Sequence, residues 1–425
     1  MTTRTDDETG PRLTSTPAPL GKLLGIAVAL GAANSLGLLG FEWVTEHLQH
    51  LIWLDWANTD ERRWLVLPLA IAGSVGLSLT LRTVRQPRLQ APHTDLLAEA
   101  SQVEPSSLKS IGILLLVGVI SLVGGASLGP EGAILPASVA LGAWYSGRSE
   151  STADMSQVLV LSSVGALLVS FFGSLIPAPL PILMLRKQGR QVTLASAVIS
   201  LIAAATAWAL VSVIRGETQG PQILPVSSGA NLKVGLTAMG LGALAVVAGV
   251  MLRSVIRTAG RLTERIDKGW NWILGSSLFG AVIGILYWAG GESVQFSGHL
   301  GTHMLYEDRS TYGIAALLAL LAVKMLVTGW SVASGYRGGM AFPAVYMGVA
   351  LGLAATAAFP ELPQTGTMIG ALAGILAEMT SPIVAVIIVL SLMPLKLLPI
   401  GLAGALGAVA GRRGLEKILP RTRQG

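Results

Sequence analysis

The chain of 425 residues contains no cysteine, few aromatic residues and few charges. Without cysteine, disulfide bonds, thiol chemistry and cysteine-ligated zinc are excluded. Only 12% of the residues are charged, against about 25% in soluble domains. Charged side chains therefore cannot cover an ordinary water-facing surface. Because 52% of the residues are hydrophobic, a disordered scaffold is excluded as well, and the composition favours a polytopic membrane protein over a soluble enzyme.

Charge is scattered thinly along the chain, with 29 basic and 23 acidic residues and a net charge of +6. Such a distribution gives no sign of a nucleic-acid partner, and in a membrane protein it bears on topology instead. Basic residues cluster after several apolar runs, whereas acidic residues mark the 42–61 segment. The basic clusters are Arg82, Arg85 and Arg88; Arg186, Lys187 and Arg190; Arg253, Arg257, Arg261, Arg265 and Lys268; and Arg412, Arg413 and Lys417. Because basic loops favour the cytoplasm, we expect a multi-pass protein of the inner (plasma) membrane, with both termini cytoplasmic and the 42–61 loop outside.

Several apolar runs approach the ~20 residues that cross a bilayer. They lie at about 20–41, 64–81, 110–126, 192–214, 232–252, 270–290 and 313–333. Others are short or interrupted: 132–146 contains Pro136, 157–185 is broken by Gly173 and three prolines, and 342–359, 366–377, 382–393 and 395–410 are marginal. Helices broken inside a membrane leave unpaired backbone groups, which are tolerated only inside protein or beside a wet cavity. The interruptions therefore indicate a transport pathway.

An internal repeat links two of the interrupted regions. Ala126-Ser-Leu-Gly-Pro-Glu-Gly-Ala-Ile-Leu-Pro136 matches Ala333-Ser-Gly-Tyr-Arg-Gly-Gly-Met-Ala-Phe-Pro343 without a gap, and Val-Ala-Leu-Gly follows each copy. Further along, Ala178-Pro179-Leu180 has a counterpart in Ser381-Pro382-Ile383. Two related halves with broken helices at corresponding positions place a substrate site between them, near the middle of the membrane.

Glu131 is the first candidate site residue, because it is the only carboxylate between Glu104 and Glu150. A charged side chain at membrane depth costs about 2.5–3.5 kcal/mol on insertion scales, so it is a functional candidate by default. Pro130 suits the first turn of a helix, which places Glu131 at a helix N-terminus, where free N–H groups favour negative charge. A site that holds a carboxylate can also hold a mobile anion when the carboxylate moves away.

The second loop, 335–343, is rich in glycine. Gly338 and Gly339 allow a sharp turn and a close approach to the backbone. The run that follows would direct another helix N-terminus at the same point as the helix of Glu131. Two converging N-termini form an anion site from backbone N–H groups alone.

Together these two loops resemble those of the CLC family of chloride channels and chloride/proton antiporters, and most of all a divergent bacterial branch of ion-transport proteins. The likeness runs from about residue 20 to 420 and also includes Glu378-Met-Thr-Ser-Pro-Ile. It implies an all-α homodimer in which each subunit has its own pore and two inverted halves, here 19–215 and 216–420. It also implies that Glu131 is the gating glutamate. Gly129, Gly132, Gly338, Gly339, Met340, Ala341 and Phe342 are then the expected anion-binding residues.

Further expectations concern the ends of the chain and ligands, and those for the ends follow from the Thr-, Asp- and Pro-rich composition of residues 1–18 and from the few residues after the last apolar run. Residues 1–18 are expected to form a disordered cytoplasmic tail, residues 421–425 a second tail, and no regulatory domain is expected after the last span. No cofactor or resident metal is implied. The expected partners are a small anion, possible protons and membrane lipid.

Departures from the family pattern bear on the mechanism. The usual Gly-Arg-Glu-Gly-Pro reads Gly129-Pro130-Glu131-Gly132-Ala133, so one backbone donor is missing. The place of the early serine motif reads Gln90-Ala-Pro-His-Thr94, and we interpret the similar Gly173-Ser174-Leu-Ile-Pro177 as a decoy. Leu415 stands for the family's anion-contacting tyrosine, and no acid occupies 186–189, where Gln188 is the nearest neutral polar group. These losses argue against tight central chloride binding and against proton antiport.

Other polar residues leave alternatives open. Lys324, inside an apolar span, either attracts anions or binds a structural partner such as a carbonyl. His299 and His303 have the i,i+4 spacing of metal ligands, but no acid is nearby, and we do not predict a metal site. Arg337 either faces a vestibule or braces its loop. Interfacial anchoring is the expected role of tryptophans near span ends: Trp43, Trp53, Trp56, Trp64, Trp270 and Trp272.

The leading functional hypothesis is transport of a small inorganic anion, chloride first, gated by Glu131. The alternatives are a proton-coupled antiporter and selectivity for another anion such as fluoride or nitrate. A membrane-embedded hydrolase is disfavoured, because no His-Glu-x-x-His motif, paired carboxylates within a span or Ser/His pair at membrane depth is present.

Overall fold

The computed structural model describes residues 20–57, 61–89, 107–148, 153–187, 189, 192–216 and 229–418. Within these residues all regular structure is helical, apart from one isolated β-bridge. The expected tails (1–18 and 421–425), segment 90–94 and Gln188 lie outside the described residues.

Helices α1–α8 form the first group along the chain. Their bounds are α1 (Leu20–Gln49), α2 (Val66–Thr83), α4 (Leu108–Val123), α5 (Pro130–Arg148), α6 (Ala153–Phe172), α7 (Leu180–Lys187) and α8 (Leu194–Arg215). The second group comprises α9 (Leu232–Gly269), α10 (Trp272–Gly290), α11 (His299–Glu307), α12 (Ile314–Ala333), α13 (Ala341–Ala358), α14 (Gln364–Met379), α15 (Pro382–Ser391) and α16 (Leu398–Ile418).

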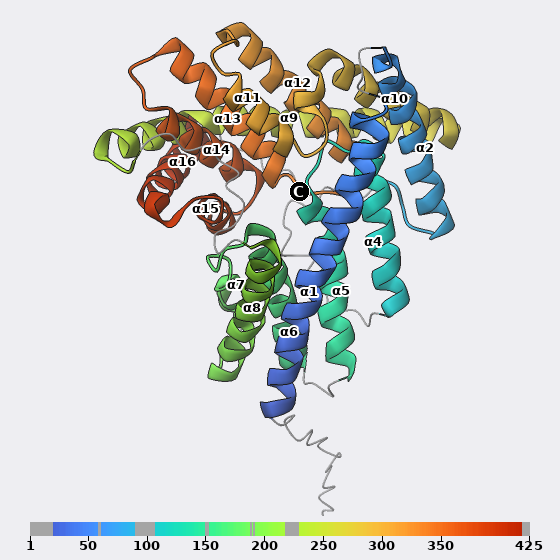
Figure 1. Ribbon diagram of the computed structural model, residues 1–425, viewed down its shortest axis with the longest axis vertical. Coiled ribbons are helices and arrows are strands. Elements are labelled where there is room, and N and C mark those ends of the chain that lie inside the picture. The colour runs from blue at the N-terminus through green and yellow to red at the C-terminus, as the bar shows by residue number, and fades with distance from the viewer. Residues whose placement is uncertain are drawn as a thin grey trace, which may run out of the picture.

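The two groups pack by the same scheme. In the first, α5 packs on α4 and α6, α6 and α8 pack on each other, and both contact α1; in the second, α13 packs on α12 and α14, α14 and α16 pack on each other, and both contact α9. In Figure 1, α4–α8 lie mainly in the lower part of the molecule and α9 with α11–α16 in the upper part. This recurrence agrees with the repeat in the sequence, while the boundary at residue 215 stays a prediction.

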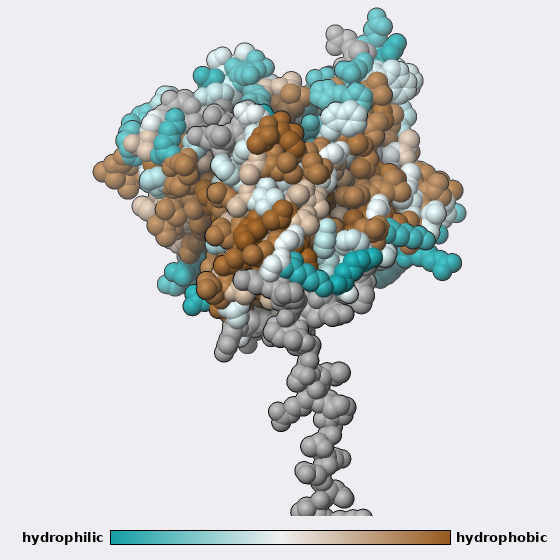
Figure 2. Space-filling model, turned by 60° about the horizontal axis from the view of Figure 1, so that its bottom comes forward, coloured by the Kyte–Doolittle hydropathy of each residue, from teal (hydrophilic) through white to brown (hydrophobic). Residues whose placement is uncertain are grey.

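The lipid-facing character of the fold is visible in helix length and in surface composition. Among the described residues, 9 helical segments are long and apolar enough to cross a membrane, and α4 and α15 are shorter apolar helices. Large apolar side chains remain exposed on these segments, for example Leu194 (82%), Val213 (79%) and Leu232 (78%). Figure 2 shows apolar side chains over much of one face, with polar groups toward its edges. The protein is therefore an all-helical, multi-pass membrane protein.

Several segments differ from the expected ones. The runs 342–359 and 395–410, expected to be marginal, correspond to helical segments long enough to cross a membrane, and α5 continues through Pro136. The segment 42–61, expected as a loop, is helical up to Leu54, because α1 continues to Gln49 and a π-helical turn covers His50–Leu54. Glu42 is accommodated inside this helix by an ion pair with Arg215 at 2.6 Å. Likewise α9 runs past its apolar part to Gly269, so the basic cluster of 253–268 lies on a helix rather than in a loop.

The prediction for Trp53 was wrong. Its side chain is 1% exposed, and its Nε1–H donates to the carbonyl of Val123 at 2.8 Å. Trp53 therefore lies inside the protein, where it donates a hydrogen bond to a carbonyl at the end of α4, and it does not anchor the protein at the membrane–water interface. The exposed tryptophans Trp43, Trp56, Trp64 and Trp270 lie on the surface, and Trp272 receives the guanidinium of Arg82 over its ring at 4.9 Å.

Small residues allow the helices and loops to approach closely, as in other membrane bundles. On α2, Gly73 lies against the backbone of Gly124, and a Cβ at residue 73 would be 2.7 Å from the Gly124 carbonyl carbon. Gly76, one turn further along the same helix, has open space around it. The close contact places α2 directly against the loop that leads to Glu131.

We expect Gly73→Ala to destabilise the protein by about 1–3 kcal/mol, because the added methyl group overpacks this contact. Gly76→Ala is the matched control: it adds the same methyl group and the same helix propensity on the same helix, without a clash. The measurement is thermal unfolding of both variants in detergent. Equal unfolding temperatures for the two would contradict the packing described.

Candidate functional site

The two glycine-rich loops of the repeat are joined directly by backbone hydrogen bonds. The N–H of Gly129 donates to the carbonyl of Gly339 at 2.8 Å, and the N–H of Gly339 donates to the carbonyl of Gly129 at 2.7 Å. This antiparallel bridge is the one isolated β-bridge in the described part of the chain. It holds the start of α5 next to the start of α13. These two helices therefore begin at a common point inside the protein.

Glycine is required at this junction by the lack of space. A Cβ at Gly129 would lie 2.7 Å from Cδ of Glu131, and a Cβ at Gly339 would collide with the same carboxylate group. A Cβ at Gly132 would collide with the backbone of Gly338 and Gly339. Larger residues would therefore separate the two helix starts or displace Glu131.

Glu131 lies in the first turn of α5, directly after Pro130, as the sequence predicted. The residue is 7% exposed, and its Oε1 accepts a hydrogen bond from the backbone N–H of Ala341 at 2.8 Å. Its Oε2 is buried and has no hydrogen-bond partner among the described residues. The carboxylate thus sits on the N-terminus of α13, where free N–H groups and the helix dipole favour a negative charge.

The other expected site residues lie around this carboxylate or beside it. Met340 immediately precedes α13, and Ala341 and Phe342 form its first turn. The ring of Phe342 packs against Phe171, with centroids 5.1 Å apart, and against His299 at 5.5 Å. The structure therefore brings Gly129, Glu131, Gly132, Gly338, Gly339 and Ala341 together, and their role in binding an anion stays a prediction.

The backbone carbonyls at the end of α4 accept hydrogen bonds from side chains in distant parts of the chain. Gln49 donates to the carbonyl of Leu122 at 3.0 Å, Trp53 to that of Val123, and the Tyr287 hydroxyl to that of Gly125 at 3.0 Å. The last carbonyls of a helix have no partner within it, and water is scarce at this depth. These donors therefore fix the first loop in the conformation that presents Glu131.

The side chain of Arg88 donates hydrogen bonds to the second loop in the same way. Its Nε–H donates to the carbonyl of Ser334 at 2.8 Å, and its two other nitrogens bond to the hydroxyls of Ser74, Ser78 and Ser276. Burial lowers the pKa of the Arg88 guanidinium below its ordinary value. The surrounding oxygens and the ring of Phe279, 4.8 Å away, offset part of that cost.

Arg337 braces its own loop, one of the two roles considered for it. Its Nη2 donates to the carbonyl of Pro87 at 2.9 Å, and its backbone N–H donates to the hydroxyl of Ser121 at 2.6 Å. The same residue also lines the cavity described below.

Lys324 is fully buried and bonded to structural partners. Its Nζ donates to the carbonyls of Val294 at 3.0 Å and Phe296 at 2.8 Å, and to the hydroxyl of Ser127 at 3.0 Å. The Tyr346 ring centroid lies 5.3 Å from the same nitrogen. Of the two roles considered for this residue, the structure supports the structural one: Lys324 ties α12 to the loop that precedes Glu131.

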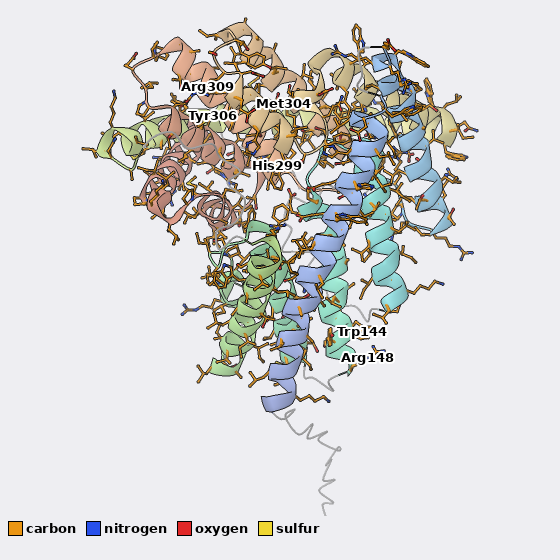
Figure 3. The ribbon with its side chains drawn as sticks, viewed as in Figure 1. Trp144, Arg148, His299, Met304, Tyr306 and Arg309 are labelled. Carbon is orange, nitrogen blue, oxygen red and sulfur yellow. The ribbon has the colours of Figure 1, made fainter. Side chains whose placement is uncertain are left out.

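The histidine pair lies on α11, which Figure 3 shows with His299 at one end and Tyr306 near the other. The rings of His299 and His303 are 5.2 Å apart. Among the described residues, no group of three or more potential ligands could hold a metal ion.

A cavity of about 830 Å³ leads away from Glu131. Both glycine-rich loops contribute to its lining. Besides Glu131, its charged lining residues are four arginines, of which Arg337 belongs to the second loop, and one further carboxylate: Arg253, Arg257, Arg337, Arg412 and Glu378. Sequence reasoning missed Glu378 as a site residue. The motif that begins with Glu378 was part of the family resemblance. The burial of Glu378 beside the cavity, however, depends on contacts between α9, α14 and α16, which the sequence alone does not reveal.

Neither the serine motif interpreted as a decoy, Gly173–Pro177, nor Leu415, which stands for the family's tyrosine, contributes to this site. Gly173–Pro177 forms the connection between α6 and α7, and neither Ser174 nor Leu415 lines the cavity. Leu415 is partly buried and packs against the apolar core. Instead, Tyr336 from the second loop contributes an aromatic side chain to the lining.

Comparison with known proteins gives consistent matches. The family described as "Voltage gated chloride channel" matches residues 77–412. Curated relatives named "Putative ion-transport protein YfeO", from Escherichia coli strains including SE11, are 28% identical over 362 residues, which cover 83% of this chain and 84% of theirs.

Among solved structures, a slow cyanobacterial Cl⁻/H⁺ antiporter superposes with a TM-score of 0.72 at 21% identity, covering 95% of this chain and 99% of that one. A CLC-type fluoride/proton antiporter gives 0.69 at 17% identity, covering 92% and 94%. A eukaryotic CLC transporter gives 0.70 at 14% identity, covering 93% and 72%. These likenesses establish the fold.

We expect Lys324→Met to lower stability by about 1–3 kcal/mol or more, because the change leaves buried carbonyls without a donor. The control is Lys396→Met, which removes the same group from an exposed position. Thermal unfolding in detergent measures both. A Lys324→Met protein as stable as the control would show that the three hydrogen bonds do not support the loop.

Proposed function

Because the chain belongs to the voltage-gated chloride channel family, we propose that it carries small inorganic anions, chloride first, through a pore in each subunit, with Glu131 as the gate. The observation that carries the proposal is the hydrogen bond from the Ala341 N–H to the Glu131 carboxylate. A negatively charged oxygen already occupies the N-terminus of α13, and an anion of similar size can take its place.

The proposed mechanism is competition for this one place. Backbone N–H groups at the start of α13 replace part of the anion's hydration shell, and the dipole of the helix favours negative charge there. While Glu131 is ionised and bound, the place is filled and the pathway is closed. Protonation removes the charge from the carboxylate and weakens its hold, so flux is expected to rise as pH falls.

Proton-coupled exchange is the second candidate. The observation that favours it is the buried Oε2 of Glu131, which has no hydrogen-bond partner among the described residues and is available to a proton. Two of the structures with the same fold are antiporters that exchange protons for chloride or fluoride. Proton movement driven by an imposed chloride gradient in sealed vesicles separates exchange from a passive channel.

Further expectations belong to the same proposal. The protein is proposed to be a homodimer in the inner membrane, surrounded by lipid, with both termini in the cytoplasm, and to have no enzymatic activity. The charge distribution supports the orientation, since the basic cluster of 253–268 lies at one end of α9. The ion among chloride, fluoride and nitrate is to be identified by efflux with each anion.

We expect Glu131→Gln and Glu131→Ala to raise chloride efflux from reconstituted vesicles at neutral pH and to abolish its dependence on pH. Glutamine imitates the protonated gate and alanine removes it. Hydrogen bonds to charged groups contribute about 1.5–3 kcal/mol, so the increase should be about tenfold to a hundredfold.

The control is Glu361→Gln, which removes one carboxylate from an exposed position between α13 and α14. It should leave both the rate and its pH dependence unchanged. Efflux that is indifferent to substitution of Glu131 would show that this residue is not the gate.

A further inference from the structure

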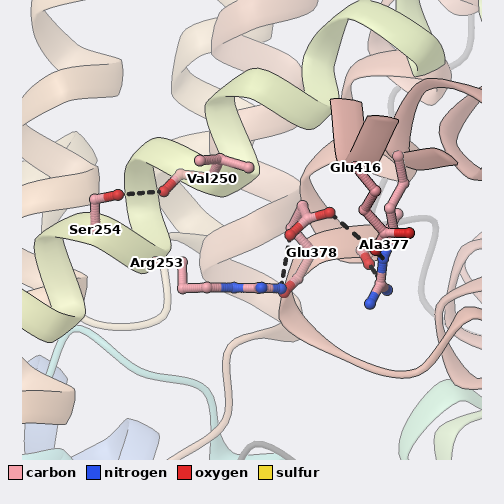
Figure 4. Close-up of polar contacts among 7 residues, drawn as sticks. Val250, Arg253, Ser254, Ala377, Glu378 and Glu416 are labelled. Carbon is pink, nitrogen blue, oxygen red and sulfur yellow. Dashed lines mark hydrogen bonds and ion pairs between the residues drawn. The ribbon is translucent and has the colours of Figure 1, made fainter. Parts of the chain in front are cut away.

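Helices α9, α14 and α16 each contribute a charged residue to the lining of the cavity. Arg253 comes from α9, Glu378 from the end of α14 and Arg412 from α16. All three line the same cavity as Glu131. Figure 4 shows Glu378 with Arg253 on one side and Glu416 of α16 on the other.

Glu378 is held between two cations. Its Oε2 lies 2.7 Å from Nη2 of Arg253, and its Oε1 lies 3.5 Å from Nε of Arg412. The carboxylate side chain is 1% exposed, whereas Arg253 and Arg412 are 25% and 20% exposed. A carboxylate removed from water in this way requires compensation by charge, and the two guanidinium groups provide it.

The arginines are held in place independently of that carboxylate. Nη1 of Arg412 donates to the carbonyl of Ala377 at 2.7 Å, and Nη2 of Arg253 donates to the carbonyl of Glu378. Cations that bond the last carbonyls of a helix are a common C-terminal cap. Nε of Arg412 also lies 3.3 Å from Oε1 of Glu416, so the charge of Arg412 is shared between Glu416 and Glu378. The contacts with the backbone carbonyls neutralise neither guanidinium group. The two cations therefore stay at the cavity when the Glu378 side chain rotates away.

Positive charge exceeds negative charge along this lining. Four arginines and two glutamates are among the described lining residues. Glu131 fills the N-terminus of α13, and Glu378 fills the gap between Arg253 and Arg412. The two glutamates thus share one arrangement, in which a tethered carboxylate occupies a place favourable to an anion.

We propose that Arg253 and Arg412 form a second anion-binding site, for a halide or a similarly small inorganic anion, and that Glu378 occupies this site as a tethered competitor. The site lies at the end of the cavity that the charge distribution assigns to the cytoplasm. An anion entering from that side displaces Glu378 before it reaches Glu131. The inference rests on the proposed function, because it adds a second binding site to the anion pathway.

Binding is tested first, without any transport. Glu378→Gln removes the competitor and leaves both arginines, so chloride should bind and stabilise the folded protein. We expect the unfolding temperature of Glu378→Gln in detergent to rise with chloride, relative to gluconate at the same ionic strength, by clearly more than that of the wild type. Adding Arg412→Gln to this variant should abolish the extra rise.

Arg261→Gln is the matched control for loss of charge. Arg261 is exposed on α9, two turns beyond Arg253, and does not line the cavity. Glu378→Gln/Arg261→Gln should keep the full response to chloride. Should Glu378→Gln fail to fold, Glu378→Asp withdraws the carboxylate from Arg253 and should show a smaller rise of the same kind. A chloride response equal to that of the wild type in the variant that folds would overturn the proposal.

Transport provides the second measurement, made in the Glu131→Ala background so that the first gate does not limit efflux. Glu378→Gln should lower the chloride concentration for half-maximal efflux severalfold, and Arg412→Gln should raise it. Unchanged values in both would overturn the proposal. Absence of flux in every variant, with the chloride response of Glu378→Gln intact, would instead refute the proposed function and leave the binding site standing.

Discussion

Two backbone hydrogen bonds, between Gly129 and Gly339, are the constraint on which the rest of the structure depends. They join the starts of α5 and α13, which belong to different copies of the repeat, at one point inside the protein. Each helix start presents free N–H groups, and their proximity creates a place where negative charge is favoured without a basic side chain. Glu131 fills that place through the N–H of Ala341.

The polar residues buried around this point make the interruptions possible. Trp53, Tyr287 and Arg88 donate to carbonyls that α4, α12 and their loops leave without partners, and Lys324 ties the Ser127 hydroxyl to α12. In a membrane each unsatisfied group would cost several kcal/mol. These buried donors are therefore explained by the interruptions, and Glu131 and Glu378 are the acids that line the cavity among the described residues.

The sequence predicted those features that depend on residues close together in the chain. Hydropathy predicted the multi-pass helical fold, and Pro130 with the glycines on both sides predicted that Glu131 starts a helix near the 338–343 turn. It did not predict that α1 continues past Glu42, because the ion pair with Arg215 joins residues 173 positions apart. Trp53 and Glu378 were missed for the same reason: their burial depends on which distant helices pack beside them, and a single sequence does not contain that information.

The most direct test of the account is the position of a heavy halide in an experimental structure. Crystals of the Glu131→Gln protein soaked in bromide should show anomalous density within hydrogen-bonding distance of the Ala341 N–H, where the carboxylate oxygen lies in the wild type. Bromide found elsewhere along the pathway, with the start of α13 vacant after the substituted side chain has moved away, would contradict the claim that the gate and the anion compete for one helix N-terminus.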